Sequence, residues 1–302
     1  MTINPGKSLK NNSRSFLKFG PLILLLLCLE GCILGENQSQ FNGEKAFEYV
    51  NRQLTFGPRI PGGEGHEVFI NWAINELLSF GWQVQKQNFL YHETQLTNII
   101  AEKGQGTNWI VLGAHYDSRK FADHDPIYEN RQQPVLGAND GASGVAILLE
   151  LARVLKINSS LKISLVFFDG EDQGQISDWD WIIGSSYYVS QLINRPSKVI
   201  IIDMVGDKEL NIFRENTSDQ FITSEIWKTA ELLGYNSSFI DNTKYTMIDD
   251  HAPFLSSNIP ASLIIDFDYR FWHTTKDTIE QISPLSLRIV GATLQSWISH
   301  QQ

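Results

Sequence analysis

The segment Leu161-Lys-Ile-Ser-Leu-Val-Phe-Phe-Asp-Gly-Glu-Asp172 joins an apolar run to a cluster of acidic side chains. Residues 161–168 are mostly apolar, which is typical of a strand buried on both faces of a parallel sheet. The acidic residues follow directly, so we expect them just beyond the carboxyl end of that strand. Open α/β sheets build their sites at this edge. The segment therefore predicts an α/β fold whose site includes Glu171 and Asp172.

The rest of the chain repeats this alternation of apolar strands and helices. Strands are expected at 109–114, 199–204 and 261–265, and helices at 66–80, 143–155, 184–192, 219–233 and 286–298. Residues 82–91 and 96–101 alternate between apolar and polar side chains, like half-buried antiparallel strands. Together these patterns predict a single three-layer α/β/α domain with a mostly parallel central sheet.

The N-terminus predicts export. Four basic residues within positions 7–18 precede an apolar run at 22–29, which is short for a membrane span. Leu29-Glu-Gly-Cys32 then resembles a bacterial lipobox, with cleavage before Cys32 and lipidation of its thiol. An ordinary secretory signal or an uncleaved anchor are the alternatives. We expect a lipoprotein-type signal peptide at 1–31, a linker at 32–44, a catalytic domain at 45–302, and an exported protein in the cell envelope, the periplasm or the medium.

Charge and cysteine content restrict the partners. The formal net charge is −10, and residues 1–31 carry four basic groups and one acidic group, so the processed chain would be near −13. This charge argues against nucleic acid as a partner. The other cysteine, Cys28, lies in the expected signal, so Cys32 would remain alone and no disulfide could form within the processed chain. We expect membrane contact only through a lipid on Cys32.

Several possible metal ligands fall at strand ends or in the loops that follow them. Taken singly, a histidine after a strand is often structural, and an aspartate before glycine is usually a turn residue. Taken together, they share one predicted edge of the sheet. Imidazole and carboxylate ligands suit zinc, and manganese, cobalt and iron also accept them. The candidate ligands are His115, Asp140, Asp172, Asp203 and His273.

The ordered set resembles the zinc-dependent exopeptidase fold shared by bacterial aminopeptidases and animal-type glutaminyl cyclases, and the resemblance covers nearly all of residues 45–300. It implies that Asp140, Asp172 and His273 hold zinc and that Glu171 is the general acid/base. In two-metal aminopeptidases the positions of His115 and Asp203 bind a second ion, with Asp140 as the bridge. Many members have glutamate where this chain has Asp172.

Within that family, three features resemble the glutaminyl cyclases. Trp272 directly precedes His273, the segment 249–254 reads Asp-Asp-His-Ala-Pro-Phe, and a loop with Trp179 and Trp181 follows Asp172. Two features differ. Leu263 stands where animal cyclases have an active-site histidine, and residues 137–144 are closer to the aminopeptidase pattern.

Two activities and one inactive alternative follow. A one-zinc cyclase would convert N-terminal glutamine of peptides to pyroglutamate and ammonia, with Glu171 moving the proton and Asp203 and Asp250 holding the reacting groups. Trp272 and one of Trp179 or Trp181 would form the walls of the pocket. A two-zinc aminopeptidase would use Glu171 as the base for water, with Asp250 as a possible anchor for the α-amine. A metal-binding surface lipoprotein without activity is the third possibility, and Glu171 argues against it.

Overall fold

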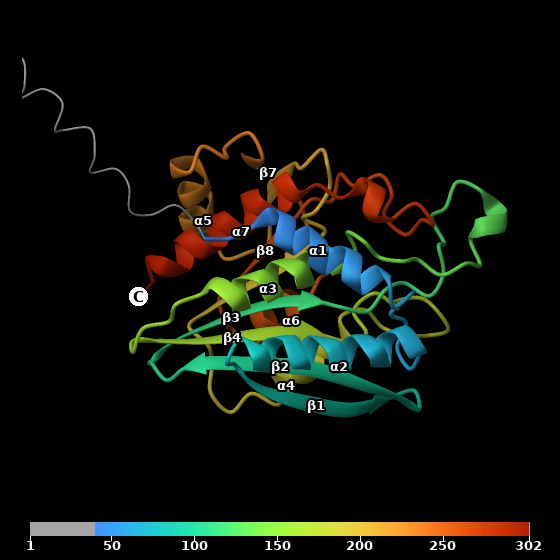
Figure 1. The fold of residues 1–302 in the computed structure, drawn as a ribbon, viewed down its shortest axis with the longest axis horizontal. Coiled ribbons are helices and arrows are strands. Elements are labelled where there is room, and N and C mark those ends of the chain that lie inside the picture. Colours follow the sequence, from blue (N-terminus) through green and yellow to red (C-terminus); the bar gives the residue numbers. More distant parts are fainter. Residues whose placement is uncertain (1–39, 302) are drawn as a thin grey trace, which may run out of the picture. The chain divides into compact units, whose positions relative to one another are not determined.

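The protein is described by a computed structural model that covers residues 40–301, which belong to one compact unit (Figure 1). The helices are α1 (Gly43–Leu54), α2 (Glu64–Ser79), α3 (Ala142–Val154), α4 (Ile183–Ser190), α5 (Gln220–Leu232), α6 (Ala252–Ser256) and α7 (Pro284–Ser299). The strands are β1 (Gln83–Tyr91), β2 (Thr94–Gly104), β3 (Asn108–His115), β4 (Leu161–Phe168), β5 (Lys198–Asp203), β6 (Ile212–Glu215), β7 (Phe239–Tyr245) and β8 (Ala261–Ile265). Two short 3-10 helices cover Tyr128–Asn130 and Ile279–Gln281.

Six strands form the central sheet in the order β1-β2-β4-β3-β5-β8. The strands β4, β3, β5 and β8 pair in parallel, and β2 pairs antiparallel with both β1 and β4. The predictions of a mostly parallel sheet and of two antiparallel strands are both confirmed, and the structure places these two strands at one edge. A separate ribbon pairs β6 with β7.

Helices cover both faces of the sheet, so its central strands are apolar on both sides. Ile110 and Leu112 of β3 belong to a core with side chains of α1, α2, α3 and α7, whereas Val111 belongs to a second core with residues of α4 and α6. In Figure 1, α2 and α3 pass in front of the sheet and the fainter α4 and α6 lie behind it. The predicted three-layer α/β/α architecture is confirmed.

The folded unit begins earlier than the predicted boundary at residue 45. Phe41 is buried against Gly291 of α7, which leaves no room there for a larger side chain. Asn42 caps α1, because its side chain accepts hydrogen bonds from the amides of Glu44 and Lys45. The end of the expected linker therefore belongs to the domain.

The expected signal peptide at 1–31, which contains Cys28, and the expected lipidation site Cys32 lie outside the described residues, and cleavage and lipidation stay predictions. Within residues 40–301, no helix combines the length and the apolar character needed to cross a membrane.

Candidate active site

The predicted ligands converge at the carboxyl end of the parallel strands. His115 ends β3 and Asp203 ends β5, while Asp172 follows β4 and His273 follows β8. Asp140 lies just before α3. The shared strand direction places all five at one edge of the sheet, as the sequence predicts.

The five side chains form two groups that share one carboxylate. Within each group, one candidate ligand atom per residue lies within 4.8 Å of the others. In the first, His273 Nε2 is 2.9 Å from Asp172 Oδ1 and 3.7 Å from Asp140 Oδ2. In the second, His115 Nε2 is 3.0 Å from Asp140 Oδ1 and 3.1 Å from Asp203 Oδ1. The Asp140 carboxylate is thus placed to bridge two ions.

The chemistry of these residues fits a metal ion. Asp172 Oδ2 and His273 Nε2 are buried without a hydrogen-bond partner. Burying such atoms unpaired is costly, whereas a cation bound between them would use their lone pairs. Burial also raises the pKa of Asp172, to about 6, with the nearby Asp140 charge adding to the effect. Carboxylates crowded in this way gain from a cation.

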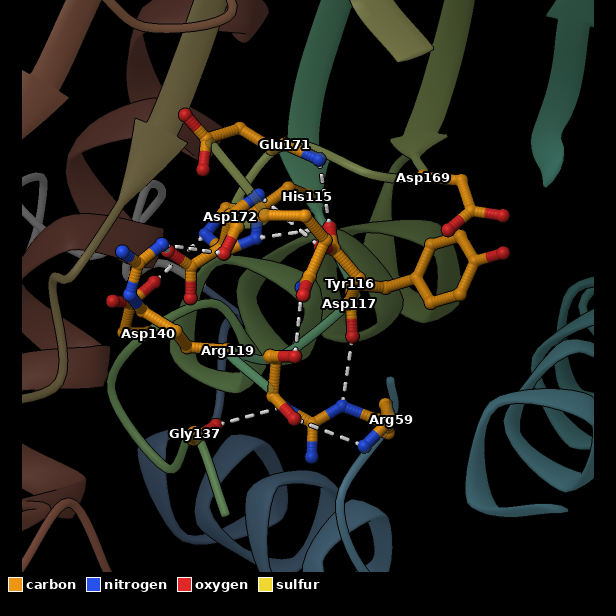
Figure 2. Close-up of polar contacts among 12 residues, drawn as sticks. Arg59, His115, Tyr116, Asp117, Arg119, Gly137, Asp140, Asp169, Glu171 and Asp172 are labelled. Carbon is orange, nitrogen blue, oxygen red and sulfur yellow. Dashed lines mark hydrogen bonds and ion pairs between the residues drawn. The ribbon is translucent and has the colours of Figure 1, made fainter. Parts of the chain in front are cut away.

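Surrounding side chains fix the orientation of the ligands. Asp117 accepts hydrogen bonds from the amides of Glu171 and Asp172, and its Oδ1 lies 3.5 Å from His115 Nδ1. This is the position expected of a residue that orients the imidazole. On the other side, Asp277 accepts from the amides of Asn139 and Asp140. Figure 2 shows the amide of Glu171 joined by a dashed line to Asp117, with His115 close by.

Glu171 points away from the ligand groups and lines a pocket of about 310 Å³. Burial raises its pKa well above the ordinary value; His115 opposes this shift, and the charges of Asp249, Asp250 and Asp172 add to it. A carboxyl group with a raised pKa suits transfer of a proton in both directions. Glu171 and Asp172 therefore face different surroundings although they are adjacent in the chain.

The pocket wall is partly as predicted. Trp181 and Trp272 line it, and the aromatic side chain of Phe267 adds to the apolar surface. Trp179 does not line it. Its ring instead packs edge-on against Tyr91, with 5.3 Å between centroids, so it belongs to a neighbouring cluster of apolar residues.

The acidic pair at 249–250 also differs from the expectation. Asp249 lines the pocket, whereas Asp250 is fully buried and does not. Both carboxylate oxygens of Asp250 are without a hydrogen-bond partner. Burial, followed by the charge of Asp249, raises the pKa of Asp250 well above its ordinary value. The residue of this pair that lines the pocket is therefore Asp249, which the sequence analysis did not select.

Leu263 is buried in β8 and belongs to the core on the α4 and α6 face. It does not line the pocket. Leu263, which replaces the active-site histidine of the animal cyclases, is thus a core residue in this protein.

A buried set of imidazole and carboxylate ligands at the carboxyl end of a parallel sheet, beside an unliganded glutamate, defines a class of α/β metalloenzymes. The model of "Peptidase family M28" matches residues 98–298. The chain belongs to this family.

Similar proteins include enzymes of both types considered above. A glutaminyl-peptide cyclotransferase of Drosophila melanogaster is 29% identical over 265 residues, which span 74% of this chain and 72% of that protein. The crystal structure of Porphyromonas gingivalis glutaminyl cyclase has a TM-score of 0.83 and 33% identity, and the alignment covers 88% of this chain and all (100%) of that one. A structure described as a leucine aminopeptidase precursor from Bacteroides thetaiotaomicron has a TM-score of 0.82 and 33% identity. The alignment covers 88% of this chain and 99% of that one.

Proposed function

We propose that this protein is a glutaminyl-peptide cyclotransferase that converts the N-terminal glutamine of peptides to pyroglutamate and releases ammonia. The observation that carries the proposal is the pocket itself. Glu171, Asp203 and Asp249 meet there beneath Trp181 and Trp272, directly beside the metal-ligand group. The similarity to cyclotransferases over most of the chain supports the same activity.

Asp140, Asp172 and His273 are proposed to hold one zinc ion. When bound, zinc would act as a Lewis acid toward the γ-carbonyl of the substrate glutamine. The wall formed by Trp181 and Trp272 would exclude water from the glutamine side chain, which favours attack by the substrate's own amine over hydrolysis.

Glu171 is proposed as the proton carrier. The substrate α-amine forms a bond to the side-chain carbonyl carbon, and the bond from that carbon to the amide nitrogen breaks. Glu171 takes a proton from the attacking amine and gives it to the departing nitrogen, which leaves as ammonia. Asp203 and Asp249 line the same pocket and are proposed to hold the amine and the leaving group in line. Asp250, which the sequence analysis selected for this role, does not line the pocket.

A metallo-aminopeptidase is the second candidate. The observation that favours it is the position of Asp140, which belongs to both ligand groups and could bridge two ions. His115 and Asp203 would then hold the second ion, and Glu171 would deprotonate a water molecule. The similarity to the leucine aminopeptidase precursor also supports this second activity.

Metal content measured together with ammonia release separates the two candidates. The purified protein is expected to contain one zinc per chain and to release ammonia from peptides that begin with glutamine. Two ions per chain, with no ammonia from such peptides, would favour the aminopeptidase.

A further inference from the structure

Arg119 lies directly behind the candidate metal site and is almost completely buried, with 3% of its surface exposed. Its Nη1 donates to the backbone carbonyl of Asp172 at 3.0 Å and, at 3.3 Å, to that of Gly174. The same nitrogen is 3.6 Å from Asp172 Oδ1. Figure 2 shows Arg119 beside Asp172, on the chain that continues from His115 and Asp117. The guanidinium therefore fixes the backbone that carries one proposed ligand.

The other side of the guanidinium binds Asp123, which faces a second proposed ligand. Arg119 Nε and Nη2 donate to the two Asp123 oxygens at 2.8 and 2.6 Å, a bidentate geometry. Asp123 Oδ1 is in turn 3.5 Å from His273 Nδ1. A carboxylate at this position favours the proton on Nδ1, and it leaves Nε2 free to bind a metal.

Arg119 also supports the pocket wall. Its guanidinium carbon is 4.9 Å from the centroid of the Trp181 ring, a cation–π arrangement. Trp181 also stacks on His273, whose ring is nearly parallel to it with 6.1 Å between the centroids. One side chain thus contacts the tryptophan that lines the pocket and the loop that carries Asp172, and it reaches His273 through Asp123.

We propose that Arg119 is a positioning residue that sets the metal-ligand geometry and the tryptophan wall together. It fixes Asp172 through its backbone, His273 through Asp123, and Trp181 through its planar face. This inference rests on the proposed metal site. The role requires the planar guanidinium of an arginine. A lysine ammonium can pair with Asp123, but it has no planar face and fewer hydrogen-bond donors.

Zinc binding by the metal-free protein tests the proposal without relying on turnover. Arg119→Gln is expected to weaken zinc affinity by about 10-fold to 100-fold, measured by competition with a chromophoric chelator, as is usual when the partner of a ligand is lost. Arg119→Lys is expected to recover part of that affinity. Its KM for a glutamine-initiated peptide should stay raised, because Trp181 has lost its support.

The matched control is Lys198→Gln. Lys198 pairs with Glu225 at the start of β5, the opposite end of that strand from Asp203. This variant loses a partly buried ion pair, yet its zinc affinity and KM should match those of the native protein.

A folded Arg119→Gln variant with native zinc affinity would overturn the proposal, even if it were less stable. If that variant does not fold, Arg119→Lys and Asp123→Asn decide, and native zinc affinity in both would overturn it. In either case a native protein that still forms pyroglutamate would leave the proposed function standing. A native protein that binds no zinc would overturn the metal site and this inference with it.

Discussion

At the scale of single residues, Glu171 and Asp172 show how two adjacent carboxylates acquire different roles. Both amides donate to Asp117, which fixes the turn. Both side chains line the pocket, but Asp172 contacts His273 and belongs to a candidate ligand group, whereas Glu171 belongs to neither group. The turn therefore separates the proposed metal ligand from the proposed proton carrier.

Glu171→Gln should retain metal and lose turnover by roughly 100-fold to 10,000-fold, because an amide keeps the shape of the side chain but cannot carry the proton. Asp172→Ala should instead lose metal. Metal content and kcat, measured on both purified variants, check this assignment. Metal loss in Glu171→Gln, with metal retained in Asp172→Ala, would reverse it.

The neighbours Asp249 and Asp250 allow a second comparison. Asp249→Asn should reduce kcat strongly, because this carboxylate faces the reacting groups. Asp250→Asn should have little effect on kcat, since Asp250 is buried outside the pocket lining and an amide is close to it in shape. Steady-state kinetics on the two variants test this, and a larger loss from Asp250→Asn would contradict the placement.

At the scale of elements, the sequence predicted those strands in which nearly every consecutive residue is buried. Residues 261–265 are apolar on both faces and form β8 with the expected bounds. In contrast, α1 was not predicted, because its buried face rests on a few side chains such as Ala46 and Val50 within a charged segment. The mostly exposed β7, with Asp241 and Lys244, also gave no strand pattern.

The β6 strand ends at Glu215, which holds the loop that carries Asp249. Its buried carboxylate accepts hydrogen bonds from the amides of Thr217, Ser218 and Met247. Burial alone would raise the pKa of Glu215, but His251 and these amides lower it to about 2. Because the folded chain binds this proton less readily than the unfolded chain, the stabilisation is present above about pH 5. It is lost as the pH falls towards 2.

Glu215→Gln should therefore lower the free energy of unfolding at pH 7 by on the order of 3 kcal/mol, and by much less at pH 3. Urea unfolding at the two pH values measures this. The control is Glu231→Gln, which removes an exposed partner of Lys228 and should change little at either pH. An equal loss at pH 7 and pH 3 would show that the charge of Glu215 is not responsible.

At the scale of the whole molecule, the fold explains why the site was largely predictable. Parallel strands bring their carboxyl ends to one edge, so His115 and Asp203 could be placed together although they are far apart in the sequence. Loop geometry was not predictable in the same way. Trp179 and Trp181 are two residues apart in the sequence. Only the conformation of the folded loop directs Trp181 to the pocket and Trp179 to Tyr91.

Arg119 illustrates the same limit. Arg119 lies four residues after the candidate ligand His115, and nothing in the surrounding sequence distinguishes it from an arginine exposed to solvent in a loop. Its contacts with Asp172 and Trp181 arise only when the loop after β3 and the loop after β4 meet behind the site.

The measurement that tests the central claim most directly is the mass of the product formed from one peptide that begins with glutamine. The account predicts a peptide lighter by one ammonia, with ammonia released in equal amount and no free glutamine. Peptides that begin with leucine or alanine should stay intact. Release of free leucine or alanine from such peptides, at a rate equal to or above cyclisation, would contradict the account and identify the protein as an aminopeptidase.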